Sequence, residues 1–380
     1  MKALLRKRRS QHSLSLFLFL VLSVLIGACK EQSKSNTHQN NTVDSNRKLQ
    51  DSVNKMKPSF NQNFGITSLE ENGDGKISGV FRKIFEDSKG NLWLGTEGGA
   101  YRHDGSSLKF FEDIKDKNGQ NVTIKDITED KNGSVWFGHT GGVSKLKGET
   151  ITNYSEKDGL LNNDVWSISV DSSGVIWIGT LQGVCYYDGE KFTPFNIPDA
   201  QPDETRGVTS AKIVHCIMED STGKMWFGTN GGAYIFDGTS LSNLSEEDGL
   251  CNNNVHSIHE ASDGVIWIGT THNGFCSYDG KSFTNYNNHI ELNSSEVWNV
   301  YQDYTDNIWI TGKHLGAYRY NGKSFTHFDK EDGLLSAGIL SILEDKDGQL
   351  WFGGISGLFR FDGSSFISVR KNGPWGNKKN

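Results

Sequence analysis

Eleven histidines are the residues of this 380-residue chain best suited to catalysis or metal binding. His139, His272 and His314 each follow an apolar-Trp-apolar phrase, so we expect them at equivalent turns. Imidazole is a common metal ligand and a general acid or base near neutral pH. No His-x-x-x-His helix, Cys-x-x-Cys pair or Gly-x-Ser-x-Gly motif accompanies them. The sequence therefore predicts no catalytic residue, no metal ligand and no cofactor.

Composition narrows the class of protein. Lys and Arg number 39 against 46 Asp and Glu, which gives a net charge of −7. Without a basic block the chain has no cationic footprint for phosphates, so we expect no nucleic-acid partner. A hydrophobic fraction of 35% is enough to bury a core. The 44 Gly and 10 Trp indicate β structure with many tight turns.

Residues 1–29 have the pattern of an export signal. Positive residues such as Arg8 precede an apolar run at 14–26, and the segment ends in Gly27-Ala28-Cys29. This ending resembles the lipobox of bacterial lipoproteins, which implies lipidation of Cys29. A plain secretory peptide or an uncleaved anchor is the alternative. Lys30, rather than Asp, implies by the sorting rule of lipoproteins the outer membrane of the bacterial cell envelope, on its periplasmic side or at the cell surface.

Residues 30–57 are rich in Asn, Gln, Ser and Lys, with almost no apolar side chains. Such a segment cannot offset its chain entropy by burial, so we predict a flexible polar tether. No second apolar run reaches the length of a membrane helix. We therefore expect no transmembrane signalling segment in this chain, a folded part at 58–370 and a C-terminal tail at 371–380.

The folded part is built from seven copies of one unit. Tryptophans recur at intervals of 41 to 49 residues, nearly always inside an apolar-Trp-apolar-Gly phrase, and they are Trp93, Trp136, Trp177, Trp226, Trp267, Trp309 and Trp351. Each copy holds four short apolar stretches separated by Gly-containing turns, many of them Asp-Gly pairs that suit tight hairpins. A period of this length is typical of propeller blades. The sequence predicts an all-β fold, a seven-bladed β-propeller of four-stranded antiparallel blades.

The unit also has a recognisable phrase. It reads Glu-Asp-x-x-Gly-x-apolar-Trp-apolar-Gly-Thr-x-x-Gly, then aromatic-Asp-Gly-x-x-Phe and Asp-Gly-Leu, and residues 219–250 match it almost throughout. This phrase resembles the two-component regulator propeller repeat over residues 80–370. The resemblance implies a seven-bladed propeller of the kind found in the periplasmic sensor part of hybrid histidine kinases. It does not imply kinase activity, because the kinase core and receiver have no counterpart here.

One end of the propeller is the expected binding face. In a four-stranded meander, the turn between strands two and three and the link to the next blade lie at the same end. The turns and links at that end supply the predicted ligand-binding residues, which are Trp166, Trp298, His139, His272, His314, Glu97, Gln182, Asn230 and His256. Indole rings beside amide and hydroxyl groups suit stacking on a sugar ring or docking of a peptide.

Other interpretations stay open at this face. The two tryptophans could fill space between blades, and the nearby asparagines at 162–163 and 252–254 could satisfy turn backbone. The long link at 196–212 holds two of the five prolines and is either a rim over the channel or a functionless loop. A propeller lyase or hydrolase that uses His and Glu97 over the channel is the alternative function.

Two smaller expectations concern closure and cysteines. Residues 65–69 and residues 366–369 both align with the outer strand of a blade, and we expect the N-terminal segment to pair with blade seven, because closure across the termini removes an exposed edge. Cys185 and Cys276 occupy the same slot two blades apart, so they should not meet. A bridge between Cys216 and Cys251 is less favoured than two free thiols.

These features predict a lipid-anchored cell-envelope propeller that acts as a non-enzymatic ligand-binding or protein-interaction module. Its expected partners are the membrane through the anchor, a glycan, peptide or envelope protein as ligand, and a membrane histidine kinase for which it would be the sensor.

Overall fold

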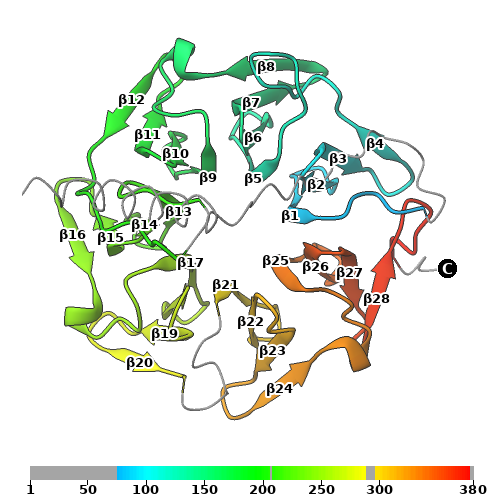
Figure 1. Cartoon of the computed structure of the whole chain (residues 1–380). Coiled ribbons are helices and arrows are strands. Elements are labelled where there is room, and N and C mark those ends of the chain that lie inside the picture. Colours follow the sequence, from blue (N-terminus) through cyan, green and yellow to red (C-terminus); the bar gives the residue numbers. More distant parts are fainter. Residues whose placement is uncertain (1–74, 206–207, 288–295, 377–380) are drawn as a thin grey trace, which may run out of the picture. The chain divides into compact units, whose positions relative to one another are not determined.

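The computed structural model describes residues 75–205, 208–287 and 296–376. Within these ranges the chain forms seven sheets of four antiparallel strands, each sheet built from four strands consecutive in sequence. The sheets are arranged as blades around a central opening (Figure 1). The predicted seven-bladed β-propeller is therefore confirmed.

The blades follow the chain in order. The innermost strands are β1 (Phe81–Glu86), β5 (Ile124–Glu129), β9 (Val165–Val170), β13 (Val214–Glu219), β17 (Val255–Glu260), β21 (Val297–Gln302) and β25 (Gly338–Glu344). The second strands are β2 (Leu92–Thr96), β6 (Val135–His139), β10 (Ile176–Thr180), β14 (Met225–Thr229), β18 (Ile266–Thr270), β22 (Ile308–Gly312) and β26 (Leu350–Ile355). The third strands are β3 (Gly99–His103), β7 (Gly142–Lys147), β11 (Gly183–Tyr187), β15 (Gly232–Phe236), β19 (Phe275–Tyr278), β23 (Ala317–Tyr320) and β27 (Gly357–Phe361). The outer strands are β4 (Leu108–Phe110), β8 (Thr150–Tyr154), β12 (Phe192–Phe195), β16 (Leu241–Leu244), β20 (Phe283–Asn285), β24 (Phe325–Phe328) and β28 (Phe366–Val369).

The second strands carry the repeated tryptophan phrase and are almost wholly buried. The glycine of that phrase has a packing role. A Cβ at Gly95 would lie 2.8 Å from Ile124 of the next blade, and a Cβ at Gly353 would lie 3.0 Å from Phe81. Glycine thus lets the inner strand of one blade approach the second strand of its neighbour, including from blade seven to blade one.

Each repeated tryptophan is also bonded to the turn before it. Asp130 illustrates the arrangement, because its Oδ1 accepts the backbone N–H groups of Asn132 and Ser134 while its Oδ2 accepts Nε1–H of Trp136 at 2.8 Å. Burial raises the pKa of Asp130, but these hydrogen bonds outweigh it and leave the pKa below its usual 3.8. The same Asp–Trp bond occurs in six blades, through Asp87, Asp130, Asp171, Asp220, Asp303 and Asp345. Blade five has Ala261 in this position.

A second set of hydrogen bonds joins neighbouring blades at these same turns, where the inner strands end. The backbone N–H of Ser88 in the β1–β2 turn donates to Oε2 of Glu129 at the end of β5, at 2.6 Å. The equivalent acceptors at the other bonded seams are Glu219, Glu260, Gln302, Glu344 and Glu86. Val170 ends β9, so the seam between blades two and three has no such side-chain acceptor.

The ring closes with blade seven made entirely of C-terminal strands, which corrects the expected pairing of the N-terminal segment. The outer position is taken by β28, which pairs with β27, while residues 65–69 lie outside the described residues. The chain before β1 runs along blade seven instead. The N–H of Ser356 donates to the carbonyl of Gly79 at 2.7 Å, and the N–H of Lys371 donates to that of Gly75 at 2.9 Å. These backbone bonds, the bridge between Val80 and Ile355 and side-chain packing close the seam, while β28 fills the outer edge.

The links between blades contain three short 3₁₀ helices, η1 (Glu156–Asp158), η2 (Glu246–Asp248) and η3 (Lys330–Asp332). In η1 the Ser155 hydroxyl caps the helix, and Asp158 bonds back to Ser155 N–H. Gly159 follows at a φ of 98°, which favours glycine, and Leu160 is buried. The Asp-Gly-Leu phrase of the repeat therefore forms a capped turn, and its buried leucine attaches the link to the hydrophobic core.

Several predictions concern residues that the structure does not describe. They are the leader at 1–29 with Cys29, the tether at 30–57 and the start of the folded part up to residue 74. In the described part, no helix is long and apolar enough to cross a membrane.

Candidate functional site at the channel mouth

All seven inner strands depart from regular pairing at the same place. In β1, Phe81 pairs with Thr96 and Lys83 pairs with Gly95, so Arg82 is left out of register. The same bulge recurs in every inner strand, and the seven bulged residues, here called the bulge ring, are Arg82, Lys125, Trp166, His215, His256, Trp298 and Leu340. A β-bulge redirects a side chain and is common beside functional sites. These residues lie where the inner strands begin, at the end that also carries the β2–β3 turns and the links.

Contacts between neighbouring blades show that the bulge ring is continuous over at least four blades. The Lys125 ammonium lies 3.7 Å from the centroid of the Trp166 ring. Trp166 meets His215 edge to face at 5.8 Å, and His215 stacks on His256 at 4.4 Å. Blades two to five therefore present one connected strip of cationic and aromatic groups around the opening.

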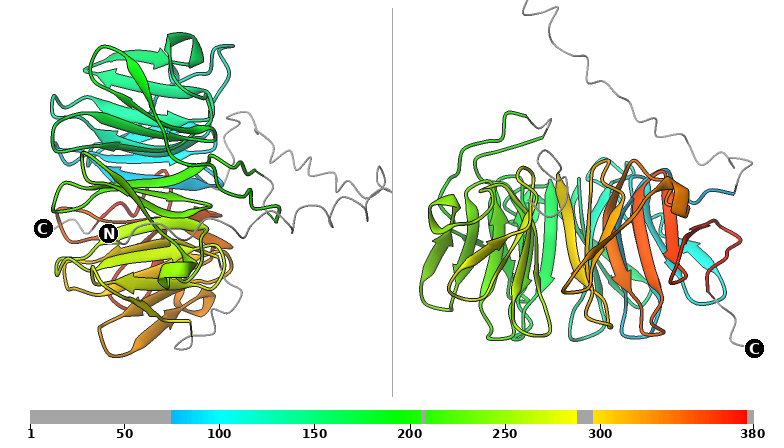
Figure 2. Two further views of the ribbon diagram at one scale, coloured as in Figure 1. Left: turned by 90° about the vertical axis from the view of Figure 1, so that its left-hand side faces the viewer. Right: turned by 90° about the horizontal axis from the view of Figure 1, so that it is seen from below.

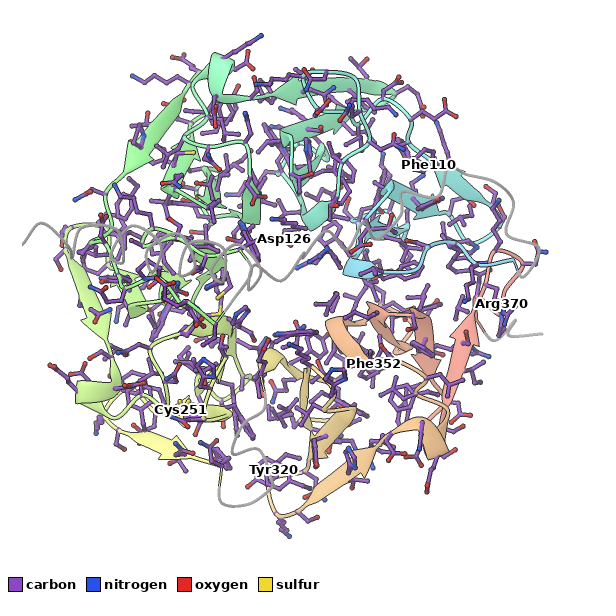
Figure 3. All side chains as sticks on the ribbon, in the orientation of Figure 1. Phe110, Asp126, Cys251, Tyr320, Phe352 and Arg370 are labelled. Carbon is purple, nitrogen blue, oxygen red and sulfur yellow. The ribbon has the colours of Figure 1, made fainter. Side chains whose placement is uncertain are left out.

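The charges around this strip are paired. Lys125 Nζ contacts Asp164 Oδ1 at 2.5 Å, and Arg82 contacts Glu97 at 3.6 Å. One step deeper along the inner strands, Lys83 contacts Asp126 at 2.8 Å. Figure 3 shows Asp126 at the inner edge of the ring, whereas Phe110 and Arg370 lie at the periphery. Each of these three cationic side chains therefore has a carboxylate partner.

Both predicted tryptophans belong to the bulge ring and are half-buried. Trp166 Nε1–H donates to Asp164 at 3.2 Å, and Trp298 Nε1–H donates to Glu296 at 3.0 Å. The Trp298 ring also lies against Gly338 of blade seven, where a Cβ would come within 2.6 Å of it. Trp298 therefore packs between blades with part of its ring and keeps the rest accessible.

The long link at 196–212 crosses this face and is bonded to it. Asp203 Oδ2 accepts Nδ2–H of Asn254 at 2.7 Å and lies 3.6 Å from His272 Nε2. Thr209 Oγ1 accepts Nδ2–H of Asn230 at 3.0 Å. The link is drawn in green at the margin of the blades in Figure 2. These bonds to blades four and five give it the position of a rim.

The structure brings some of the remaining predicted residues to the mouth and buries others. Glu97 is in the β2–β3 turn and pairs with Arg82. Asn230 is buried, with its Oδ1 2.8 Å from His215 Nε2, so it positions a member of the bulge ring. His272 is half exposed beside Asp203. His314 has a φ of 54°, and its N–H donates to the carbonyl of Ala337.

His139 is wrongly predicted as a mouth residue, because the structure buries it completely. It ends β6 in the slot that Thr96 and Thr180 fill in other blades, where a hydroxyl donates to the third strand. The ring of His139 bonds Ser144 Oγ at 2.8 Å and accepts from Gly141 N–H at 3.0 Å. Burial lowers its pKa to about 3. His139 thus replaces a structural threonine and lies two residues before the positions of His272 and His314.

The asparagines of the links serve the turns, as the alternative interpretation had it. Asn162 Nδ2–H and the N–H of Asn163 both donate to Glu156 Oε1, while Glu156 N–H donates to Asn163 Oδ1. Asn252 and Asn253 repeat this arrangement around Glu246. These amides therefore stabilise the links.

Four members of the bulge ring were absent from the sequence prediction, namely Arg82, Lys125, His215 and Leu340. A signal for them exists, since each directly follows the first apolar residue of an inner strand. Aligning the seven copies in phase at that residue gives the complete ring.

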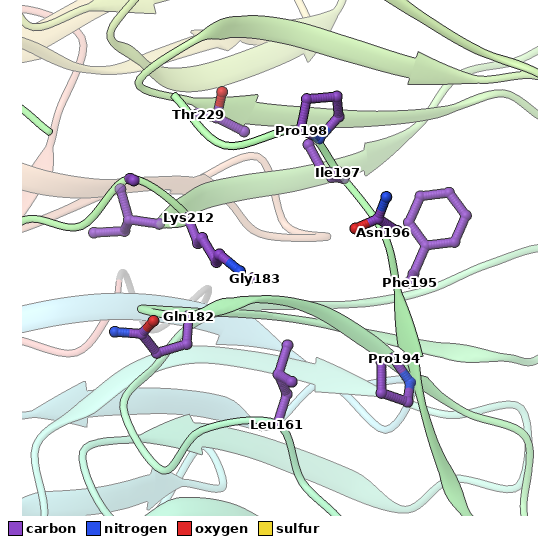
Figure 4. A pocket seen from close by; sticks show the side chains of 12 residues that line it. Leu161, Gln182, Gly183, Pro194, Phe195, Asn196, Ile197, Pro198, Lys212 and Thr229 are labelled. Carbon is purple, nitrogen blue, oxygen red and sulfur yellow. The ribbon is translucent and has the colours of Figure 1, made fainter. Parts of the chain in front are cut away.

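A small cavity of about 170 Å³ lies at the base of the long link, between blades three and four (Figure 4). Its walls come mainly from Leu161, Ile213 and the segment 194–198, and Gln182 lies at its edge. Gln182 is therefore near an apolar hollow rather than the bulge ring. Among the described residues there is no group of three or more His, Cys, Asp or Glu side chains that could hold a metal ion.

A pH-dependent property follows from the position of Lys125. Burial lowers the pKa of Lys125 to about 8, although Asp164 opposes the shift. In the unfolded chain the pKa is near 10.5, so between pH 8 and pH 10.5 the unfolded state binds more protons and stability rises with pH. We expect urea unfolding to show a gain of at most about 3 kcal/mol across this window relative to Lys125→Met. Equal pH slopes for both proteins would contradict the assignment.

The fold and the bulge ring define this chain as a seven-bladed propeller with a polar, aromatic channel mouth. A family model described as two component regulator propeller matches residues 75–98, 159–182, 207–231, 249–272 and 333–356. The chain therefore carries two-component regulator propeller repeats at five positions, in blades one, three, four, five and seven. The two unmatched blades are those in which His139 and Thr311 alter the repeated phrase.

Solved structures share the fold at low sequence identity. One is assigned as the extracellular domain of the hybrid two component system BT3049 from B. thetaiotaomicron, with 22% identity, a TM-score of 0.60, and coverage of 74% of this chain and 39% of that chain. Streptogramin B lyase has 16% identity, a TM-score of 0.58 and coverage of 74% and 93%. PorZ, a surface component of the type-IX secretion system of Porphyromonas gingivalis, has 18% identity, a TM-score of 0.58 and coverage of 75% and 47%. The chain thus spans less than half the length of two of these proteins. The sequence matches none of the curated proteins.

Proposed function

We propose that this chain is a lipid-anchored propeller of the bacterial cell envelope that binds a ligand at its channel mouth without chemical conversion. The observation that carries the proposal is the bulge at the same position of all seven inner strands, which leaves one residue of each strand out of register at one end of the channel. Bulges are over-represented beside functional sites, where they re-aim side chains, and this supports a binding role for this end of the channel.

The chemistry of the mouth favours a glycan or peptide ligand. The accessible parts of Trp166 and Trp298 offer flat apolar faces, and Arg82 and His256 add polar groups beside them. Two large apolar side chains are exposed on the same face, Val208 on the long link at 50% and Leu335 on the link to blade seven at 63%. Apolar platforms with nearby hydrogen-bonding groups recognise sugar rings and peptide side chains.

The anchor and the partner are part of the same proposal. Residues 1–29 act as the leader, Cys29 carries the lipid and residues 30–57 are the tether to the outer membrane. The two-component regulator propeller repeats support a sensory role, in which the occupied mouth is read by a membrane histidine kinase. An envelope protein is the alternative ligand.

The test is a thermal melt of residues 58–380, which include every described element, against glycans, cell-wall fragments, peptides and divalent metals, with and without chelator. A ligand at about 100 times its Kd stabilises by roughly 2.7 kcal/mol. A shift with a glycan or peptide supports the proposal. A chelator-sensitive shift with substrate turnover would favour a lyase or hydrolase instead.

For the anchor, Cys29→Ala in the full chain should release the protein from the membrane fraction, and retention would refute lipidation.

A further inference from the structure

Two cysteines that are far apart in sequence meet inside blade five. Cys251 lies in the link after η2, and Cys276 lies in β19, 25 positions later. Their Sγ atoms are 2.9 Å apart, within about 0.9 Å of the length of a disulfide bond. Both side chains are buried, Cys276 completely. This pair differs from the Cys216–Cys251 bridge that the sequence left open.

The backbone around the pair is held in place by independent contacts. Leu250, directly before Cys251, is buried in the blade-five core as part of the capped Asp-Gly-Leu turn. Asn273 Nδ2–H donates to the carbonyl of Cys251 at 3.3 Å, which joins the link to the residues just before β19. Cys276 is fixed by regular pairing with Ile268 and Asn285. The two sulfur atoms therefore meet because the fold places them there, before any bond forms.

We propose that Cys251 and Cys276 form a disulfide in the exported protein. As blade five folds, one cysteine thiolate attacks the disulfide of an oxidised thiol–disulfide oxidoreductase and forms a mixed disulfide. The thiolate of the second cysteine then attacks the sulfur of the first cysteine in that mixed disulfide. The Cys251–Cys276 bond forms and the oxidoreductase leaves as a thiolate. Two protein thiols are oxidised, the donor disulfide is reduced to two thiols, and the donor sulfurs take up the two protons.

The bridge would hold in place the segment that leads from Cys251 to His256 of the bulge ring. Cys251 precedes His256 by only a few residues, and the intervening Asn254 bonds to Asp203 of the long link. A covalent bond to β19 would restrict the motion of this segment and of β17, the strand that carries His256. The occurrence of the bond in the cell rests on the proposed export, because disulfides persist in oxidising compartments. Its geometry does not depend on export.

The experiment compares two preparations of the full chain, one exported by a bacterial host and one refolded in a glutathione redox buffer. Each is denatured without reductant, alkylated with iodoacetamide, digested and analysed by mass spectrometry. We expect a linked Cys251–Cys276 peptide pair in both preparations, and alkylated Cys185 and Cys216 as internal controls. A reductant should lower the melting temperature of the wild type, and it should have no such effect on Cys251→Ser.

The outcomes distinguish whether the fold allows the disulfide to form from whether the protein reaches an oxidising compartment in the cell. Full alkylation of both cysteines in the refolded chain would overturn the proposal outright. A bridge in the refolded chain but free thiols in the exported chain would overturn it for the cell and would also count against the proposed envelope location. Cys185→Ser, which leaves the pair intact, should keep both the linked peptides and the redox-dependent melting temperature.

Discussion

Asp130→Ala should lower the free energy of unfolding by about 3 kcal/mol, because the change removes the acceptor of three hydrogen bonds at once. Trp136 is fully buried, so its indole N–H would be left without its partner in a site closed to water. Leaving a buried donor unsatisfied is among the costlier effects of a single substitution. For a domain of this size the loss corresponds to a fall in melting temperature of roughly 5 °C.

Two further variants make this prediction specific. Asp130→Asn keeps one acceptor oxygen and should lose less stability than alanine. Ala261→Asp supplies the carboxylate that blade five lacks, beside Trp267, and should raise the free energy of unfolding by about 1 kcal/mol. If Asp130→Ala melted within about 2 °C of the wild type, the Asp–Trp bond would not be the stabilising element of the blades.

Trp166→Ala and Trp298→Ala should each weaken ligand binding by about 10- to 100-fold, since truncating an aromatic residue at the centre of a binding site typically costs 1.4 to 3 kcal/mol. Their effect on stability should be smaller, near 1 kcal/mol, because both rings are half-buried and only part of each ring packs within the fold. The measurement is the Kd of whichever glycan or peptide shifts the melt, by calorimetry.

The controls separate stacking from hydrogen bonding and from general damage. Trp298→Phe keeps a ring but removes the bond to Glu296, so it should retain most of the affinity if stacking dominates. Tyr304→Ala alters an exposed ring in the β21–β22 turn, at the opposite end of the blades, and should not change Kd. A large fall in melting temperature with unchanged affinity for the two tryptophan variants would refute their role in binding.

The repeat made the architecture predictable. Seven in-phase tryptophan phrases indicated seven blades, because the packing of each blade depends on residues within one period and its neighbour. Because each copy of the repeat could be aligned with the others, Trp166, Trp298 and His256 could be predicted at the starts of inner strands. Ring closure was not predictable in this way. Both terminal segments resemble an outer strand, and the choice between them depends on competition for one edge.

The misplacement of His139 has a different cause. His139 is the third residue after Trp136 and still belongs to β6, whereas His272 and His314 are the fifth residues after Trp267 and Trp309 and follow the ends of β18 and β22. The prediction treated the three positions as equivalent although their spacing from the tryptophan differs. Only three of the seven bulge-ring residues were predicted, because a bulge depends on how two strands pair and not on the composition of either one. The meeting of Cys251 and Cys276 depends on the path of the link, which the period does not specify.

The seam between blades seven and one also determines how the propeller would respond to a mechanical force applied at its N-terminal side. Residues 75–80 are attached to blade seven through Gly75, Gly79 and Val80, which bond in turn to Lys371, Ser356 and Ile355. A force transmitted through the residues before Gly75 would load these bonds one after another rather than together. The mechanical strength of the attachment would then be set by its strongest single bond rather than by the sum of all three.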